Sequence, residues 1–299
     1  MGKRMEGRFP GAFTTITFFG IGGQNAAMYG KMEIAEICQT PRKGCEIMRN
    51  SLRLVCLLLA IMCTCAIGEE ALRGYDAKEG YVYLTLGTFP QTKEGAELPI
   101  LWRVLSVKDG RALLLSEHVL EARRIHGDYY EYANKPTNRK KPGFDGDFTQ
   151  TEMSQYLRGD FTAHFAPEEM ALLTPDDTMG VFFLLTSEDL KNKEYGFDSN
   201  QSRKAWATEY AIENGVFVYR AARGSHSPYW SCTQSTSNIQ GARCIKSQGE
   251  LGYINVITEN LGLRPACWLD MAQVQILSGT GTKDDPYLLA PGVLTEANP

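Results

Sequence analysis

Side chains capable of catalysis do not stand at the spacings that known catalytic motifs require. Nucleophilic catalysis needs a base within hydrogen-bond reach of the nucleophile, yet neither Gly-x-Ser-x-Gly nor His-Glu-x-x-His occurs in the sequence. The paired acids Glu168-Glu169 follow a proline and favour a helix start. We expect surface histidines rather than catalytic ones at His118, His126, His164 and His226. The sequence predicts no catalytic residues and no cofactor, although an enzyme whose residues meet only in space remains an alternative.

Metal ligands and phosphate loops are also sparse. Asp145 and Asp147 could begin a calcium loop, but the ligands and the glycine that should follow are absent. Gly20-Ile-Gly-Gly23 follows no convincing strand and does not match a phosphate-binding loop. We therefore expect no bound metal.

The aromatic residues offer better candidates for a binding site. Tyr129, Tyr130 and Tyr229 lie in or beside the long polar stretches 123–147 and 225–241. Long loops on a rigid scaffold commonly carry function, and exposed aromatic rings stack on ligands. We expect these three tyrosines to contact a ligand, with loop packing as the alternative. Trp102 and Trp268 stand inside apolar runs and are expected in the core.

Residues 48–68 have the pattern of a secretory signal peptide. A short basic region, Met48 to Arg53, precedes an apolar run from Leu54 to Ile67, and small residues then precede Glu69-Glu70. The run is shorter than the ~20 residues that span a bilayer, so we expect cleavage after Gly68 rather than an uncleaved anchor. Residues 1–47 are then a mis-called extension or a disordered leader, and residues 69–79 a linker.

Three cysteines remain beyond the signal segment. Export permits disulfides, and Cys232 and Cys244 fall in neighbouring expected strands around a loop rich in Ser, Thr, Asn and Gly. We predict a bridge between these two, with Cys267 as a buried free thiol in an apolar strand. The pairs Cys232–Cys267 and Cys244–Cys267 compete with this assignment.

The charge balance excludes one class of partner. Residues 1–68 hold 8 of the 31 basic and 4 of the 35 acidic side chains, which leaves a net charge of −8 on the remainder. A nucleic-acid-binding domain needs a basic face, so we expect no nucleic-acid partner. A hydrophobic content of 43% is ordinary for a globular domain with a sizeable core.

The patterns beyond residue 80 alternate between strands and short helices. Alternating or apolar runs predict strands, and Asp109-Gly110 predicts a hairpin turn. The expected strands are 81–86, 100–107, 111–116, 181–185, 229–233, 242–245, 251–257, 262–269, 274–277 and 287–289. Helices are expected after Thr151, from Pro167 to Leu173 and from Ala205 to Ile212.

Gly262 to Leu269 is expected to close a sheet as one buried strand. Arg264 interrupts its apolar run, and a buried guanidinium needs carboxylate or carbonyl partners. Pro265 donates no hydrogen bond, which places it at a strand start or a bulge. We assign structural roles to Trp102, Arg264 and Trp268.

Five segments in order resemble a bacterial domain family of unknown function, DUF6273. They are Leu86-Gly-Thr-Phe-Pro-Gln-Thr92 with Leu101-Trp-Arg-Val-Leu105 and Leu113-Leu-Leu-Ser116; a segment from Phe148 to Phe161; Val181-Phe-Phe-Leu-Leu-Thr-Ser-Glu188; a helix segment with Arg203, Thr208 and Tyr210; and Gly262-Leu-Arg-Pro-Ala266. The chain departs from the family at Trp230-Ser231-Cys232 and at Arg158. The resemblance covers roughly residues 80–270, and its tryptophan and arginine–proline strands are similar to those of C-type-lectin-like folds.

These observations predict an α+β domain of C-type-lectin-like fold, with a mixed or antiparallel sheet, two or three short helices and long loops. Residues 80–272 form the domain, and residues 273–299 a C-terminal strand, turn and tail. The expected function is that of a secreted or cell-surface bacterial binding module without catalysis, whose partner is an extracellular glycan or protein. An extracellular enzyme and a structural domain of a surface assembly are the alternatives.

Overall fold

The computed structural model describes residues 71–127, 147–221, 224–237 and 240–292. Residues 1–70, which hold the expected signal segment, lie outside the described residues, as do Tyr129 and Tyr130. The described part is mixed α+β and consists mostly of sheet, with a few short helices.

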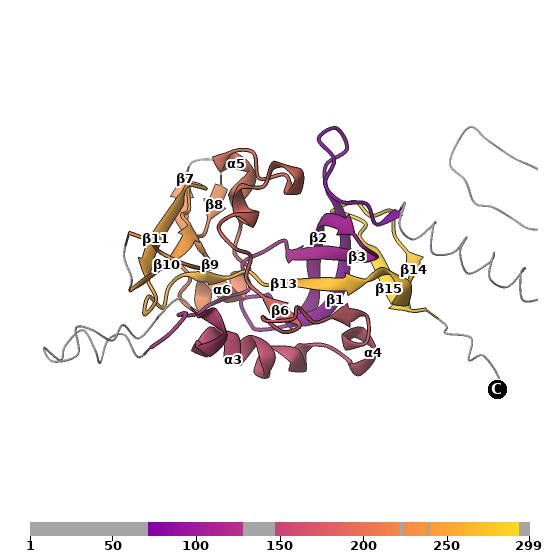
Figure 1. Cartoon of the computed structure of the whole chain (residues 1–299), viewed down its shortest axis with the longest axis horizontal. Coiled ribbons are helices and arrows are strands. Elements are labelled where there is room, and N and C mark those ends of the chain that lie inside the picture. Colours follow the sequence, from indigo (N-terminus) through magenta and orange to yellow (C-terminus); the bar gives the residue numbers. More distant parts are fainter. Residues whose placement is uncertain (1–70, 128–146, 222–223, 238–239, 293–299) are drawn as a thin grey trace, which may run out of the picture. The chain divides into compact units, whose positions relative to one another are not determined.

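An eight-stranded sheet forms the larger half of the domain (Figure 1). β1 and β15 pair in parallel, and the other neighbours are antiparallel. Its order is β14 (Val274–Ser278), β15 (Tyr287–Pro291), β1 (Val82–Pro90), β2 (Glu97–Lys108), β3 (Arg111–Ser116), β13 (Ala266–Asp270) and β5 (Leu173–Thr174), and β6 (Phe182–Phe183) also pairs with β13. The expected turn joins β2 to β3, with positive φ at both Asp109 and Gly110.

A five-stranded sheet forms the second half. Its order is β11 (Leu251–Asn255), β10 (Gly241–Ile245), β9 (Tyr229–Gln234), β12 (Gly262–Leu263) and β4 (Glu121–Ala122). A separate two-stranded ribbon pairs β7 (Tyr219–Ala221) with β8 (Gly224–His226).

Short helices connect the strands. They are α3 (Glu152–Arg158), α4 (Pro167–Met170), α5 (Asn200–Arg203) and α6 (Glu209–Glu213), with 3-10 turns η2 (Phe148–Gln150), η3 (Asp160–His164), η4 (Asp189–Lys191), η5 (Lys193–Tyr195) and η6 (Met271–Gln273). Thr151 caps α3 by accepting a bond from the Ser154 amide. The helix expected from Ala205 begins only at Glu209, because Ala207 forms a bridge with Val119 and Thr208 is the cap.

The stretch Gly262 to Leu269 joins the two sheets. The single strand expected here is wrong, because β12 belongs to the five-stranded sheet and β13 to the eight-stranded one. Pro265 stands between them and has no amide hydrogen to pair. The chain therefore passes from one sheet to the other at Arg264-Pro265.

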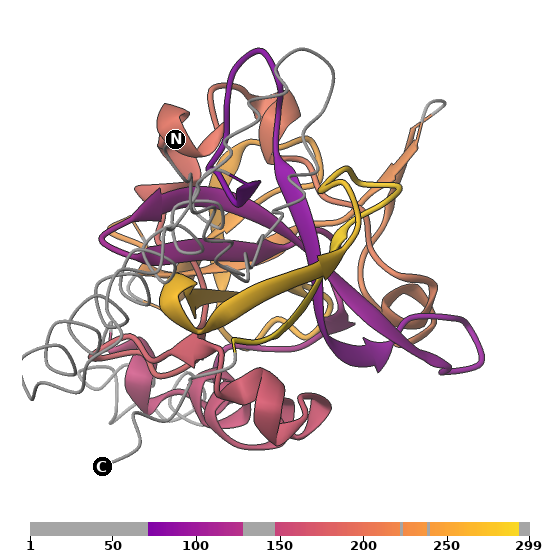
Figure 2. The same ribbon diagram turned by 90° about the vertical axis from the view of Figure 1, so that its right-hand side faces the viewer.

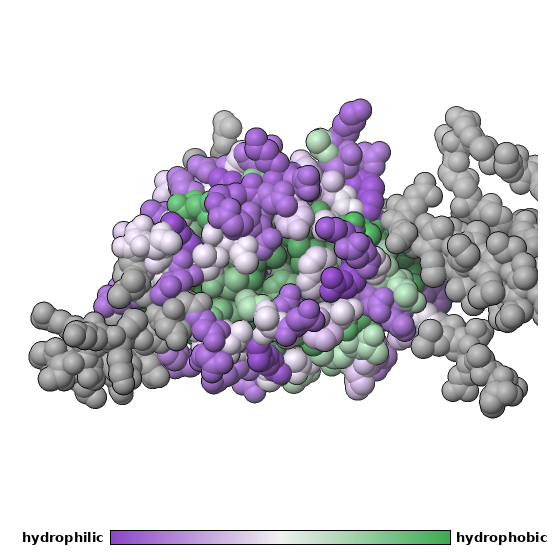
Figure 3. Space-filling model, viewed as in Figure 1, coloured by the Kyte–Doolittle hydropathy of each residue, from purple (hydrophilic) through white to green (hydrophobic). Residues whose placement is uncertain are grey.

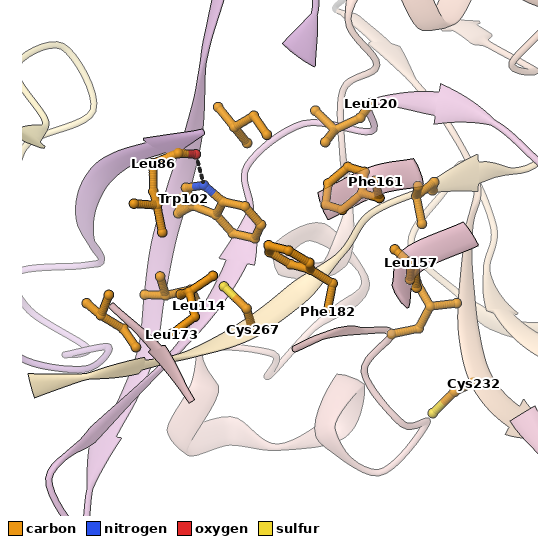
Figure 4. Packing of buried hydrophobic residues seen from close by; sticks show 14 of the residues in the cluster. Leu86, Trp102, Leu114, Leu120, Leu157, Phe161, Leu173, Phe182, Cys232 and Cys267 are labelled. Atoms are coloured by element: carbon orange, nitrogen blue, oxygen red, sulfur yellow. Dashed lines mark hydrogen bonds between the residues drawn. The ribbon is translucent and has the colours of Figure 1, made fainter. Parts of the chain in front are cut away.

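The main core lies against one face of the larger sheet. Trp102 is fully buried, donates through Nε1 to the Leu86 carbonyl at 2.8 Å, and packs beside Phe182 (Figure 4). The core cluster that contains Trp102 also contains residues from both sheets and from α3. In Figure 3, polar residues cover much of the upper part of the visible face, and apolar residues show in its middle, near β6 and β13.

Both ends of the described chain belong to the domain. Leu72 is fully buried in the main core, and the Tyr75 amide donates to the Leu105 carbonyl. The prediction of a linker at 69–79 is therefore wrong for residues 71–79, which are part of the domain. β14 and β15 extend the larger sheet beside β1, as Figure 2 shows for the yellow hairpin. The strands expected at 274–277 and 287–289 are confirmed, and they are part of the main sheet.

Candidate functional site

A buried carboxylate bridges two cations at one end of the larger sheet. The Arg103 Nε donates to Glu117 Oε2 at 2.6 Å, and its Nη2 contacts the same oxygen. The Lys283 Nζ donates to Glu117 Oε1 at 2.8 Å. The Glu117 side chain is 2% exposed, whereas that of Lys283 is 45% exposed. The Arg103–Glu117–Lys283 cluster therefore connects the interior with the surface.

Strand register brings the members of this cluster together. Tyr83, Arg103 and Leu115 stand opposite one another on β1, β2 and β3 and share one face of the sheet. Glu117 follows Leu115 by two residues, and its amide donates to Leu101. Lys283 lies in the turn between β14 and β15, which is tied to β1 by a bond from the Tyr83 amide to the Gly281 carbonyl.

Glu117 is held ionised. Burial acts to raise the pKa of this carboxyl, but the charges of Arg103 and Arg264, with the bond from Lys283, outweigh burial and lower the pKa to about 2. A general acid or base works best when its pKa lies near the operating pH. Glu117 is therefore a fixed negative charge at neutral pH rather than a proton carrier.

Arg264 adds a second buried guanidinium beside this cluster. Its Nε donates to the Ser116 carbonyl at 2.8 Å, which is one of the two kinds of partner, carboxylate or carbonyl, expected from the sequence. Its Cζ lies 5.0 Å from the centroid of the Tyr229 ring. The Nη1 and Nη2 atoms are buried and have no hydrogen-bond partner among the protein atoms. Burial lowers the pKa of Arg264, although a guanidinium stays charged at neutral pH.

A tyrosine-lined pocket lies over the cluster. Its volume is about 570 Å³, and Tyr81, Tyr83, Tyr287 and Lys283 line it together with the turn residues 280–282 and residues 71, 73, 79, 80 and 82. The Arg103 Cζ lies 4.5 Å from the centroid of the Tyr81 ring, so a residue of the pocket lining is in contact with the buried guanidinium.

Trp206 stands next to the exposed part of the cluster. Its side chain is 40% exposed, and its ring centroid lies 5.9 Å from the Lys283 Nζ. The Trp206 carbonyl accepts a bond from the Val119 amide, two residues after Glu117. The His226 ring packs on Trp206 with 4.9 Å between centroids. An exposed indole and an accessible ammonium therefore lie side by side.

The sequence-predicted site residues fall elsewhere. Tyr229 is 1% exposed on β9 and donates to the Arg203 carbonyl at 2.8 Å, so a ligand contact from a polar loop is wrong for this residue. Trp102 is core as predicted, whereas Trp268 is only partly buried, with Arg111 over its ring. His226, expected at the surface, is buried.

Cys232, Cys244 and Cys267 are all free and buried. The predicted bridge is not formed: Cys244 stands opposite Trp230, not Cys232, in the β9–β10 register. Burial raises the pKa of the Cys232 thiol to about 12 and that of Cys244 to about 11. Cys267 is the buried thiol that its strand predicts, and Figure 4 draws Cys232 and Cys267 in separate parts of the core.

Sequence reasoning missed Glu117, Lys283 and Tyr83. One signal was present, because Glu117 stands two residues after the apolar run 113–115, and an acid at the end of a buried strand needs a partner. Nothing in the sequence indicated that the partner would come from residue 283.

No protein-family model matches the chain, and no curated protein or solved structure matches it either. Among the helices that the structure describes, none is both long and apolar enough to cross a bilayer. Within the same residues, no three histidine, cysteine or acidic side chains gather as metal ligands would.

Proposed function

We propose that this chain is a secreted, non-catalytic binding module whose ligand, an extracellular glycan or protein, occupies the pocket between Tyr83 and Lys283. The observation that carries the proposal is the pocket itself. Three tyrosines and a lysine line it, and the lysine is held in place by a buried carboxylate. A concave site with a few fixed polar groups is the usual form of a ligand-binding site.

The state of the reactive groups favours binding over catalysis. The low pKa of Glu117 removes it as a proton donor at neutral pH. The raised pKa values of Cys232 and Cys244 keep these thiols protonated, and the thiol form is a poor nucleophile.

The proposal extends to the fold family and to export. The quoted motifs resemble DUF6273, and the mixed α+β architecture with short helices agrees with a C-type-lectin-like domain. The basic, apolar and small-residue order of residues 48–68 supports secretion with cleavage after Gly68. N-terminal sequencing of exported protein should therefore begin at Glu69, and a different first residue far from Glu69 contradicts this cleavage site.

The binding proposal is tested on arrays of glycans and of extracellular proteins. Tyr83→Ala should weaken binding at least tenfold, because the ring forms part of the pocket wall. Tyr253→Ala is the matched control, since Tyr253 is an exposed tyrosine on β11 of the other sheet. Equal binding by both variants removes the pocket from the proposal, and turnover of any bound substrate overturns the non-catalytic assignment.

A further inference from the structure

The charges behind the pocket do not balance. Arg103, Arg264 and Lys283 carry three positive charges around one carboxylate, that of Glu117. The pocket's other charged pair, Arg73 with Glu79, is internally neutral at 2.8 Å. The four side chains Arg103, Arg264, Lys283 and Glu117 therefore carry a net charge of +2.

The remaining titratable neighbours do not neutralise that charge. Burial lowers the pKa of His118 and raises the pKa of Tyr81 and Tyr83, so all three are uncharged at neutral pH. Asp284 and Asp285 are exposed on the same turn as Lys283, and among the described residues no ion pair joins either carboxylate to Lys283, Arg103 or Arg264.

Arg264 makes this excess costly. A buried charge without hydrogen-bonded partners is destabilising, and two of its three guanidinium nitrogens have none among the protein atoms. An anion in the pocket would lower this cost through the low-dielectric interior, where charges interact more strongly than in water.

Lys283 is the cation that a ligand can reach. Its ammonium carries three donors, and Glu117 accepts one of them. The exposed indole of Trp206 lies beside it. A ligand that places an anionic oxygen on the lysine can therefore lay a ring with an apolar face against the indole.

We propose that a carboxylate-bearing sugar binds at Lys283 on the edge of the pocket, where its carboxylate pairs with Lys283 and its ring packs on Trp206, which lies beside this lysine but outside the pocket lining. This inference rests on the proposed binding function and narrows its ligand to acidic glycans.

An acidic peptide fits the site less well. An extended peptide usually adds its backbone to an unpaired strand edge. At the pocket, β1 is paired with β2 on one side and with β15 and the Gly281 carbonyl on the other. The site therefore offers side chains to a ligand but no free strand.

Calorimetry with the full-length chain tests the proposal. The probes are oligosaccharides that contain galacturonate, glucuronate or terminal N-acetylneuraminate, each paired with its carboxyl-reduced neutral form. At least one acidic member should bind at least tenfold more tightly than its neutral form, and its affinity should fall as NaCl rises from 50 to 500 mM. Absence of binding by every acidic member overturns the inference.

Matched variants separate this inference from the broader binding function. Lys283→Gln and Trp206→Ala should each weaken the acidic sugar at least tenfold. Lys191→Gln and Tyr253→Ala should change nothing, because Lys191 is an equally exposed lysine paired with a glutamate, and Tyr253 is an exposed aromatic residue in the other sheet. If neutral sugars bind as tightly as acidic ones and Lys283→Gln does not change the affinity, the acidic-sugar proposal is contradicted. The broader proposal of a binding module then still stands. Binding of sulfated or phosphorylated sugars alone also contradicts it.

Discussion

Glu117 links the stability of the domain to pH. Its pKa of about 2 lies below the usual 4.5, so its contribution is fully present above about pH 4.5 and is lost as pH falls toward 2. Glu117→Gln should lower the free energy of unfolding by roughly 3–5 kcal/mol at pH 7 by leaving Arg103 unpaired, and should flatten this acid slope. Urea unfolding from pH 2 to 7 measures both effects. Glu188→Gln is the control, because Glu188 pairs with Lys191 at the surface and its side chain is 80% exposed. This change should alter the free energy of unfolding by less than about 1 kcal/mol.

The two buried arginines should respond differently to the same substitution. Arg103→Met breaks the pair with Glu117 and should cost roughly 3–5 kcal/mol of unfolding free energy. Arg264→Met removes a charge with two unpartnered nitrogens and fills a similar volume, so stability should change by less than about 1 kcal/mol or should rise. Urea midpoints of the two variants decide the matter. An equal loss in both would mean that Arg264 is as well paired as Arg103.

At the scale of elements, the hairpin between β10 and β11 depends on a close backbone approach. Gly249 has φ of +87°, and a Cβ added there would lie 1.7 Å from the Asn200 carbonyl oxygen at the start of α5. Gly95 has φ of +82° with open space around it. Gly95→Ala should lower the free energy of unfolding by about 1–2 kcal/mol through backbone strain alone. Gly249→Ala should lower it by more, because the added Cβ also meets the Asn200 carbonyl. Thermal unfolding of both variants compares them, and equal losses would show that α5 can move away.

Local chemistry was enough to predict most elements. Alternation, the Asp109-Gly110 turn and the Thr151 cap identified β1 to β3 and α3, because those signals act within a few residues. The helix expected from Ala205 and the single strand at 262–269 failed for one reason: pairing with distant partners overrode local pattern. Ala207 pairs with Val119, and β12 and β13 pair with strands in different sheets.

The candidate site was predictable only in part, for a similar reason. Arg264 interrupts an apolar run, so its burial with a carboxylate or carbonyl partner is expected from the sequence, and the Ser116 carbonyl is that partner. The polar stretch beside Tyr229 favours a ligand contact, yet the strand that begins at this residue buries its ring. Glu117 and Lys283 are 166 residues apart, and the pairing of β15 with β1, with the bond from the Tyr83 amide to the Gly281 carbonyl, brings the Lys283 turn to the end of β3. One sequence carries no record of that pairing.

At the scale of the whole molecule, the segment from residue 71 to residue 79 packs into the core and is not a linker. Leu72 is fully buried, and the Tyr75 amide donates to the Leu105 carbonyl. A chain that begins at Glu69 should therefore unfold at the same urea midpoint as the full chain. A chain that begins at Gly80 should lose roughly 2–5 kcal/mol, because removing a buried leucine leaves a cavity. Leu72→Ala in the full chain isolates this contact, and a Gly80 start as stable as the Glu69 start would show that the core closes without it.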